Sequence, residues 1–224
     1  MKVQALITEL GAEMADPSYR RWTPVDWLAY YNDAIRALRL VKPEAVSKRD
    51  VWKLTANETS QSLPADGYQL LGPGLVRNMG DDGATPGRSI TVANYDDIAR
   101  LDRTWHSTVG KTIIRHFCYN DQDKNHFWVY PRVHATVAVW VDGFYSFIPP
   151  DSMDPANDDL PVFDSYAHPV KLWMRYRAFL KNRESTTSMA AAQRAVSEFY
   201  SLFGIKYKAD AIASPNNPSK GELK

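Results

Sequence analysis

The sequence predicts an α+β protein in which terminal helical pairs form a small bundle with an inserted antiparallel β-domain, built as a sandwich or an open barrel. Apolar residues recur at three- and four-residue steps near both chain ends, as in amphipathic helices. Between these parts the period falls to two residues, without the helix-strand alternation of parallel βαβ units. We therefore expect a bundle from residues 1–46 and 162–208, a β-rich insertion at 47–161, and an extended, flexible C-terminal tail at 209–224.

Composition excludes several classes of protein. The chain has 224 residues, of which 44% are hydrophobic and 24% charged, as in a folded domain. Its net charge of +1 argues against a general nucleic-acid coat. The single cysteine, Cys118, excludes an intrachain disulfide and a cysteine-based zinc cluster. No apolar run approaches the roughly 20 residues that span a bilayer, so we expect a soluble protein made in a cytoplasm, with no membrane partner.

The N-terminal helices have clear boundaries. The first apolar stripe lies within residues 1–14 and ends before Asp16-Pro17. The second helix begins at Thr23, a favoured N-cap, with Pro24 at the first helical position and Asp26 in the positive first turn. Because the link between them is short and polar, these helices are expected to form an antiparallel hairpin.

Short strands follow in the middle of the chain. Residues 50–55 and 60–63 predict a hairpin around a turn at 57–59. Asn94 is expected to cap a short helix over 95–101. Further strands are expected at 89–92, 112–119, 127–130, 135–141 and 144–147. Turn residues at 120–125 and at Asp142-Gly143 predict that the last four of these strands form two hairpins.

The chain returns to helical periodicity after a proline- and aspartate-rich loop at 149–161. Asp164 is the expected N-cap of the next helix. A break at 182–187 precedes the last apolar stripe, which spans 189–203. Gly204 is the expected C-terminal stop.

Candidate catalytic and metal-binding groups are sparse. His106, His116 and His126 are ten residues apart, but zinc needs three or four converging ligands, and a turn separates the last two. The aspartates of 151–159 lack the EF-hand pattern. Cys118 has no identifiable general base or oxyanion donor. We therefore expect no catalytic residue, no metal and no cofactor, and keep a small metal-dependent hydrolase or nuclease as the alternative.

The segment Tyr19-Arg20-Arg21-Trp22 mixes basic and aromatic residues, which suits contact with nucleic acid. A hydrophobic staple formed by Trp22 ahead of the Thr23 cap explains the same residues more simply. The polar tail after the last helix is either an unused end or a strap that orders on a partner.

A succession of short motifs resembles the bacteriophage adaptor, or head-to-tail connector, proteins. The motifs are Trp27-Leu28 with Tyr31-Asn32-Asp33-Ala34-Ile35-Arg36, Lys42-Pro43-Glu44-Ala45, Val51-Trp52-Lys53-Leu54-Thr55, Gln61-Ser62-Leu63-Pro64, Arg77-Asn78-Met79, Gly87-Arg88-Ser89-Ile90, Leu101-Asp102, Trp105-His106, the run from Tyr119 to Pro131, Tyr176-Arg177-Ala178-Phe179-Leu180-Lys181, and the helix over 190–203. Their order, more than any one motif, carries the resemblance, which covers residues 22–204.

The resemblance implies a structural virion protein: a ring, usually twelvefold, at the head-tail junction, which binds the portal protein and a tail nozzle protein. Double-stranded DNA would pass through it without sequence-specific contacts. The resemblance also implies portal binding by the tail, for which the candidate residues are Ile212, Pro215, Asn216, Asn217, Pro218, Lys220 and Leu223. Candidate inter-ring or intersubunit loop residues are Asp81, Asp82, Arg88, Asp121, Asp123 and Lys124. A tail-associated module that binds host glycans is a further alternative.

Overall fold

The computed structural model describes residues 1–181 and 185–204 and confirms the α+β class. The chain divides into two compact units. Among the described residues, one unit contains Met1–Val46 and those between 149 and 204, and the other contains Ser47–Ile148. We refer to them as the helical unit and the β-rich unit, and each is described by itself.

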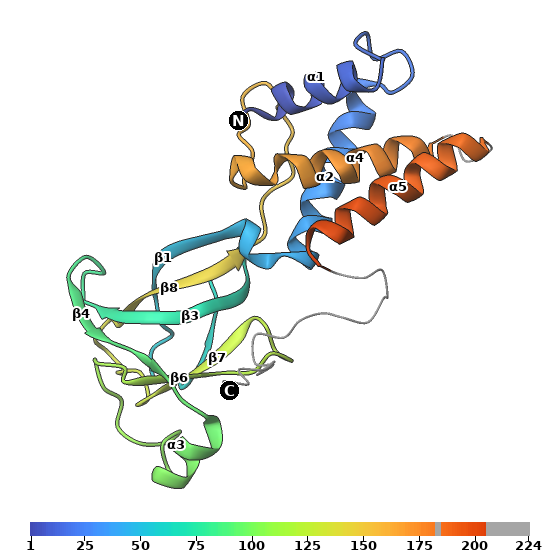
Figure 1. Ribbon diagram of the computed structural model, residues 1–224. Coiled ribbons are helices and arrows are strands. Elements are labelled where there is room, and N and C mark those ends of the chain that lie inside the picture. Colours follow the sequence, from blue (N-terminus) through green and yellow to red (C-terminus); the bar gives the residue numbers. More distant parts are fainter. Residues whose placement is uncertain (182–184, 205–224) are drawn as a thin grey trace. The chain divides into compact units, whose positions relative to one another are not determined.

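The helical unit contains four α-helices among its described residues (Figure 1). They are α1 (Val3–Glu13), α2 (Pro24–Val41), α4 (Ala167–Leu180) and α5 (Thr186–Leu202), with short 3-10 helices at Pro43–Val46 and Asp164–Tyr166. Helix α4 packs against both α2 and α5. The buried side chains on these helices include Leu6, Leu10, Trp27, Leu38, Val170, Met174 and Phe199.

The predicted N-terminus of α2 is confirmed in full. The Thr23 side chain accepts a hydrogen bond from the Asp26 backbone N–H at 3.2 Å, while the Asp26 carboxylate accepts from the Thr23 backbone N–H at 2.8 Å. This reciprocal capping box satisfies two backbone donors that the first turn leaves without helical partners. Gly204 follows α5 and has φ 66°, the left-handed conformation that commonly ends a helix, so its predicted role as the stop of the last helix is confirmed.

The predicted cap of the third long helix is wrong. A 3-10 turn over Asp164–Tyr166 precedes α4, and the N-cap of α4 is Tyr166, which makes no side-chain cap hydrogen bond. The Asp164 carboxylate instead accepts a hydrogen bond from the Met1 amino group at 3.3 Å.

The loop at 149–161 joins the helical unit, although the sequence groups it with the β-rich insertion. Its backbone carbonyl at Asp158 accepts from the Val3 N–H at 3.1 Å. Asn32 and Ser152 exchange two hydrogen bonds, one in each direction, at 3.1 and 2.9 Å. These contacts tie the loop to α1 and α2, so its proline-rich sequence forms an ordered connection within the helical unit.

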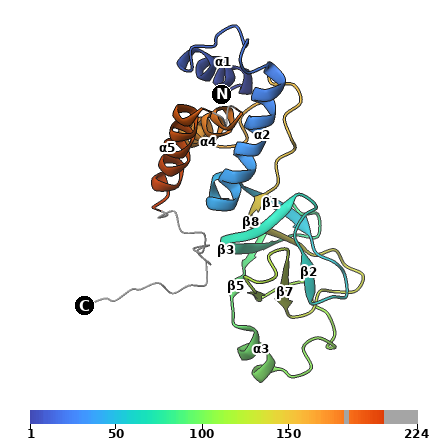
Figure 2. The ribbon, with the colours of Figure 1, turned by 90° about the vertical axis from the view of Figure 1, so that its right-hand side faces the viewer.

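The β-rich unit consists of two four-stranded sheets and a helix (Figures 1 and 2). The first sheet has the order β1 (Ser47–Lys53), β8 (Trp140–Phe147), β3 (Gly67–Met79), β4 (Pro86–Ser89), and the second has the order β2 (Ser60–Ser62), β7 (His126–Tyr130), β6 (His116–Tyr119), β5 (Thr91–Val92). All pairs are antiparallel except β5–β6. The buried core includes Trp52, Leu75, Ile114, Phe127, Val129, Val141 and Tyr145.

Two local predictions in this unit are confirmed. Helix α3 spans Tyr95–Leu101, and its N-cap Asn94 accepts a hydrogen bond from the Asp96 N–H at 2.9 Å. Strands β6 and β7 form the predicted antiparallel hairpin, although β6 begins at His116 rather than at residue 112.

Two predicted strand pairings are wrong. Strands β1 and β2 do not form a hairpin, because β1 pairs with β8 and β2 pairs with β7 in the other sheet. Asp142-Gly143 does not form a turn, since both residues lie inside the continuous strand β8, and no strand covers 135–139. Gly143 has a packing role there: a Cβ atom would lie 2.7 Å from the Trp52 ring and 2.9 Å from the Gly74 carbonyl oxygen.

Candidate interaction surfaces

The outer face of the first sheet carries a cluster of charged and apolar side chains, which we call the arginine face. Side chains that lie opposite each other in antiparallel strands share a face. The strand register therefore places Arg49, Val51, Lys53, Arg77, Met79, Trp140, Asp142 and Phe144 together on this side. The alternate residues Trp52, Val141 and Tyr145 point into the core.

Asp142 organises the centre of the arginine face. Its carboxylate accepts a hydrogen bond from Arg49 Nε at 2.7 Å and another from Arg77 Nε at 2.9 Å, and it also pairs with the Arg49 Nη2 group. The Asp142 side chain is 3% exposed, whereas those of Arg49 and Arg77 are 45% and 36% exposed. Hydrogen bonds from Arg49 lower the pKa of Asp142, and those from Arg77 add to this against the opposing effect of burial. The carboxylate thus stays ionised and holds two cationic groups at the surface.

Sequence reasoning misses this cluster because the pairing of β1, β3 and β8 is non-local. The available signal is Asp142 itself, a carboxylate in an otherwise apolar strand. A buried charge of this kind requires a partner.

The outer face of the second sheet, which we call the α3 face, is covered by apolar packing. Ile98 of α3 and Trp105 of the following loop pack against Cys118, all within 3% exposure. Trp128 and Tyr130 of β7 border this cluster. Burial raises the pKa of the Cys118 thiol to about 11, so it stays protonated near neutral pH.

The three histidines considered as metal ligands bind different partners. His106 bridges Thr59 Oγ1 at 2.7 Å and the Tyr95 hydroxyl at 3.0 Å. His116 Nδ1 lies 2.7 Å from Thr91 Oγ1, and His126 Nδ1 lies 2.8 Å from Asp123 Oδ1. Within residues 1–181 and 185–204, no three histidine, cysteine or acidic side chains are grouped closely enough to hold a metal ion.

The aspartates of the 149–161 loop serve local structure. Asp158 Oδ2 accepts from the Ser152 hydroxyl at 2.7 Å and from the backbone N–H groups of Met153 and Asp154, both at 3.1 Å. Asp159 pairs with Lys2 at 3.0 Å, and Asp151 pairs with Arg36. These carboxylates hold the loop and its neighbouring helices together.

The predicted contact residues around 80–88 lie at the end of β3 and next to the arginine face. The Asp81 carbonyl accepts from Trp140 Nε1 at 3.1 Å. The Asp82 carboxylate accepts from the backbone N–H groups of Ala84 and Thr85 at 2.9 and 3.2 Å, and these hydrogen bonds lower its pKa. Arg88 is exposed, and its carbonyl accepts from Asn78 Nδ2 at 3.0 Å. The loop is thus ordered by its own contacts while its charges face outward.

The second predicted loop lies at the opposite end of β3. Lys124 Nζ reaches the Tyr68 hydroxyl at 3.5 Å, and Tyr68 stands near the start of β3. Asp123 pairs with His126, whereas Asp121 is only partly exposed. The structure therefore does not bring Asp81, Asp82 and Arg88 together with Asp121, Asp123 and Lys124. The predicted portal-binding residues, from Ile212 to Leu223, lie outside the described part of the chain.

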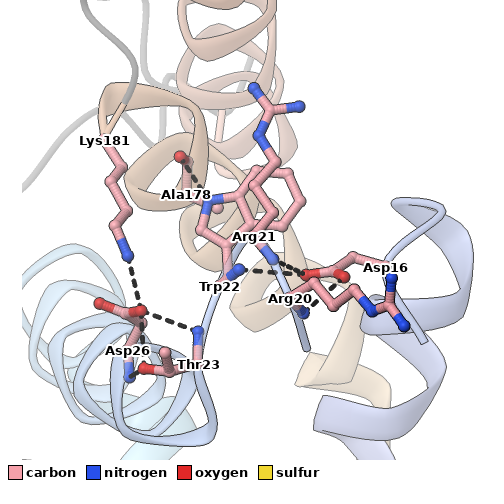
Figure 3. Close-up of polar contacts among 8 residues, drawn as sticks. All are labelled: Asp16, Arg20, Arg21, Trp22, Thr23, Asp26, Ala178 and Lys181. Atoms are coloured by element: carbon pink, nitrogen blue, oxygen red, sulfur yellow. Dashed lines mark hydrogen bonds and ion pairs between the residues drawn. The ribbon is translucent and has the colours of Figure 1, made fainter. Parts of the chain in front are cut away.

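The Tyr19–Trp22 segment forms the staple rather than a stacking platform (Figure 3). Trp22 is 2% exposed, and its indole Nε1 donates to the Ala178 carbonyl at 2.9 Å. Its ring lies 5.6 Å from that of Trp27, the contact that a hydrophobic staple predicts. A tryptophan buried in this way has no face free for a nucleic-acid base.

Asp16 fixes the connection before the staple, as Figure 3 shows. Its carboxylate accepts from the backbone N–H groups of Arg20, Arg21 and Trp22 at 2.8, 3.0 and 3.0 Å. Burial acts to raise the pKa of Asp16, but these three hydrogen bonds outweigh it and lower the pKa. The arginines contribute their backbone here, and both side chains are exposed.

These observations define an α+β protein whose distinctive features are ordered surfaces. In the described part of the chain, every helix is too short or too polar to cross a membrane. The chain belongs to the SU10 adaptor protein family, whose family model matches residues 1–219. It is therefore a structural adaptor protein of bacteriophages. No curated protein matches it.

Proposed function

We propose that this adaptor protein assembles as a connector ring, with twelve copies as the expected number, between the portal and the tail nozzle. The family match over residues 1–219 is the observation that supports this role most directly. In this proposal the ring lies at the head-tail junction of the virion, forms part of the DNA ejection channel, and is assembled in the cytoplasm of the bacterial host.

The charge balance supports passage of DNA rather than its retention. Each lysine or arginine that contacts a phosphate strengthens binding, and the chain carries a net charge of only +1. The proposed contact with double-stranded DNA is therefore weak and independent of sequence. We propose no catalytic activity for the ring, in keeping with a structural adaptor family.

The proposed portal contact is the tail at 209–224, with the loops at 80–88 and 121–125 serving neighbouring subunits or the next ring. Both loops lie in the β-rich unit at opposite ends of β3. This separation suits two different contacts rather than a single shared one.

Mass photometry tests the connector role. The protein alone and mixed with the portal protein of the same phage are measured at equal total concentration. We expect a complex with the mass of the portal plus about one adaptor copy per portal subunit. Two folded proteins that form no complex at micromolar concentration would contradict the role.

Deletion of residues 209–224 tests the strap separately. Because the deleted segment follows the last helix of the helical unit, we expect unchanged circular dichroism and melting temperature together with the loss of portal binding. A control that replaces the same residues with a glycine-serine segment of equal length separates the effect of sequence from that of length. Unchanged portal binding in both variants rejects the strap.

A further inference from the structure

The arginine face has the chemistry of a protein interface. A guanidinium carries five N–H donors, and Arg77 uses only its Nε toward Asp142. Arg49 uses its Nε and Nη2 groups toward the same carboxylate. Each arginine therefore keeps N–H donors for an external acceptor, while Asp142 fixes its position. Phe144 and Trp140 lie beside them on the same face and are partly exposed. Protein interfaces are enriched in arginine and aromatic residues, and these residues often contribute most of the binding energy.

A surface with complementary chemistry lies around the first turn of α3. Asp96 and Asp97 are exposed there, and Asp97 has only a distant pairing with Arg100 at 3.9 Å. Apolar side chains are exposed beside them: Val92 is 70% exposed and Tyr95 is 41% exposed. This patch offers carboxylates next to apolar surface, as the arginine face offers guanidinium groups next to apolar surface.

The two surfaces lie on opposite sides of the β-rich unit. The arginine face is the outer side of the first sheet, the apolar core lies between the sheets, and α3 covers the outer side of the second sheet. Figures 1 and 2 both show α3 beyond the second sheet, away from β1 and β8. Complementary patches on opposite sides of one subunit produce a head-to-tail contact, the kind that builds a ring when the rotation between successive copies closes.

We propose that the first turn of α3 in one copy docks on the arginine face of the next copy, with the carboxylates of Asp96 and Asp97 meeting Arg49, Lys53 and Arg77. The inference rests on the proposed ring and names the surfaces by which its β-rich units meet. The partner is a second copy of this chain because the chain itself presents both halves of the charge and apolar pattern.

Compensating charge reversals test the contact. Lys53→Glu changes the arginine face without leaving Asp142 unpaired, and Asp97→Lys changes the α3 turn. Both side chains are exposed, so only a small loss of folding stability is expected, most of it from a lysine in the first turn of α3, where a carboxylate is favoured. Arg194→Glu on the exposed side of α5 is the matched control, with the same charge change as Lys53→Glu. The neutral variants Lys53→Gln and Asp97→Asn replace any reversal that fails to fold.

The readout is the adaptor concentration that half-fills the portal, measured by mass photometry. We expect each single reversal to raise it by about tenfold or more, since charge pairs across an interface affect both affinity and encounter. The double variant Lys53→Glu/Asp97→Lys restores near wild-type filling, because its reversed faces again attract each other. The Arg194→Glu control fills the portal as the wild type does.

The outcomes separate this inference from the connector role. Single reversals that fill the portal normally, or a double variant as defective as the worse single, overturn the contact and leave the connector role intact. A wild-type chain that does not bind the portal rejects the connector role. In that case, sedimentation velocity measures the self-association of the same variants without portal, and this self-association tests the contact. A wild-type chain that remains monomeric with and without portal overturns both the contact and the connector role.

Discussion

The two sheets of the β-rich unit share an apolar core but differ on their outer faces. On the α3 face, Ile98 and Trp105 from the same chain bury Cys118. On the arginine face, one carboxylate holds two half-exposed guanidinium groups. The α3 face, which is covered by its own chain, is therefore stabilised by packing. The other face keeps ionised groups at the surface, at a smaller gain in folding stability.

The largest effect is expected on the covered side. Trp105→Ala removes a side chain that is 1% exposed and packs in the cluster with Ile98 and Cys118. The lost transfer energy and the remaining cavity should lower the free energy of unfolding by about 3–5 kcal/mol. Urea denaturation measures it. A loss below about 1 kcal/mol would show that the α3 layer contributes little to the fold.

A smaller loss is expected from Asp142→Ala on the arginine face. The substitution leaves Arg49 and Arg77 without their shared carboxylate, but both side chains are exposed enough for water to solvate them. We expect a loss of about 1–2 kcal/mol in the free energy of unfolding, below the value for a fully buried pair. The same denaturation series measures it, and a loss larger than that of Trp105→Ala contradicts the comparison.

The cap of α3 offers a finer test of the covered side. Asn94→Ala removes the side-chain acceptor for the Asp96 N–H and should cost about 1 kcal/mol. Asn94→Asp keeps the acceptor and serves as the control, with stability close to that of the wild type. Equal losses in both variants would show that the cap hydrogen bond is not the cause.

Acid distinguishes the two faces through Asp142. Its pKa is lowered from an ordinary value of 3.8, so its ionised form stabilises the folded state above that pH. The stabilisation disappears as the pH falls through the lowered folded-state pKa. The melting-temperature difference between wild type and Asp142→Asn should therefore shrink below about pH 4. The difference between wild type and Trp105→Ala should stay constant over the same range, because packing does not titrate.

The elements that local chemistry determines are predictable from the sequence. Thr23, Asn94 and Gly204 define helix ends through contacts within a few residues, and all three predictions are confirmed. Strand pairing in the β-rich unit is non-local, so the alternation of side chains identifies a strand without identifying its neighbour. The 53–60 connection therefore crosses between sheets where a hairpin is expected.

The wrong prediction of a turn at Asp142-Gly143 arises because aspartate and glycine occur both in turns and at special positions within strands. Asp142-Gly143 has the composition of a turn. In this protein Asp142 pairs with two arginines, and Gly143 admits the Trp52 ring. The arginine face depends on that arrangement. Because the sequence predicts a turn at Asp142-Gly143, it predicts neither the continuous strand β8 nor the arginine face.

The β-rich unit is an insertion whose first and last residues lie next to each other. Ser47 pairs with Ser146 in the first sheet, so the chain enters and leaves the unit on neighbouring strands, about 5 Å apart. A short glycine-serine link between Val46 and Pro149 would therefore leave the helical unit as one continuous polypeptide. Residues 47–148 could likewise be replaced by the equivalent residues of another family member without changing how the helices are connected. Exchange at these two junctions would change the outer faces of both sheets, the arginine face among them, and leave the sequence of the helices as it is.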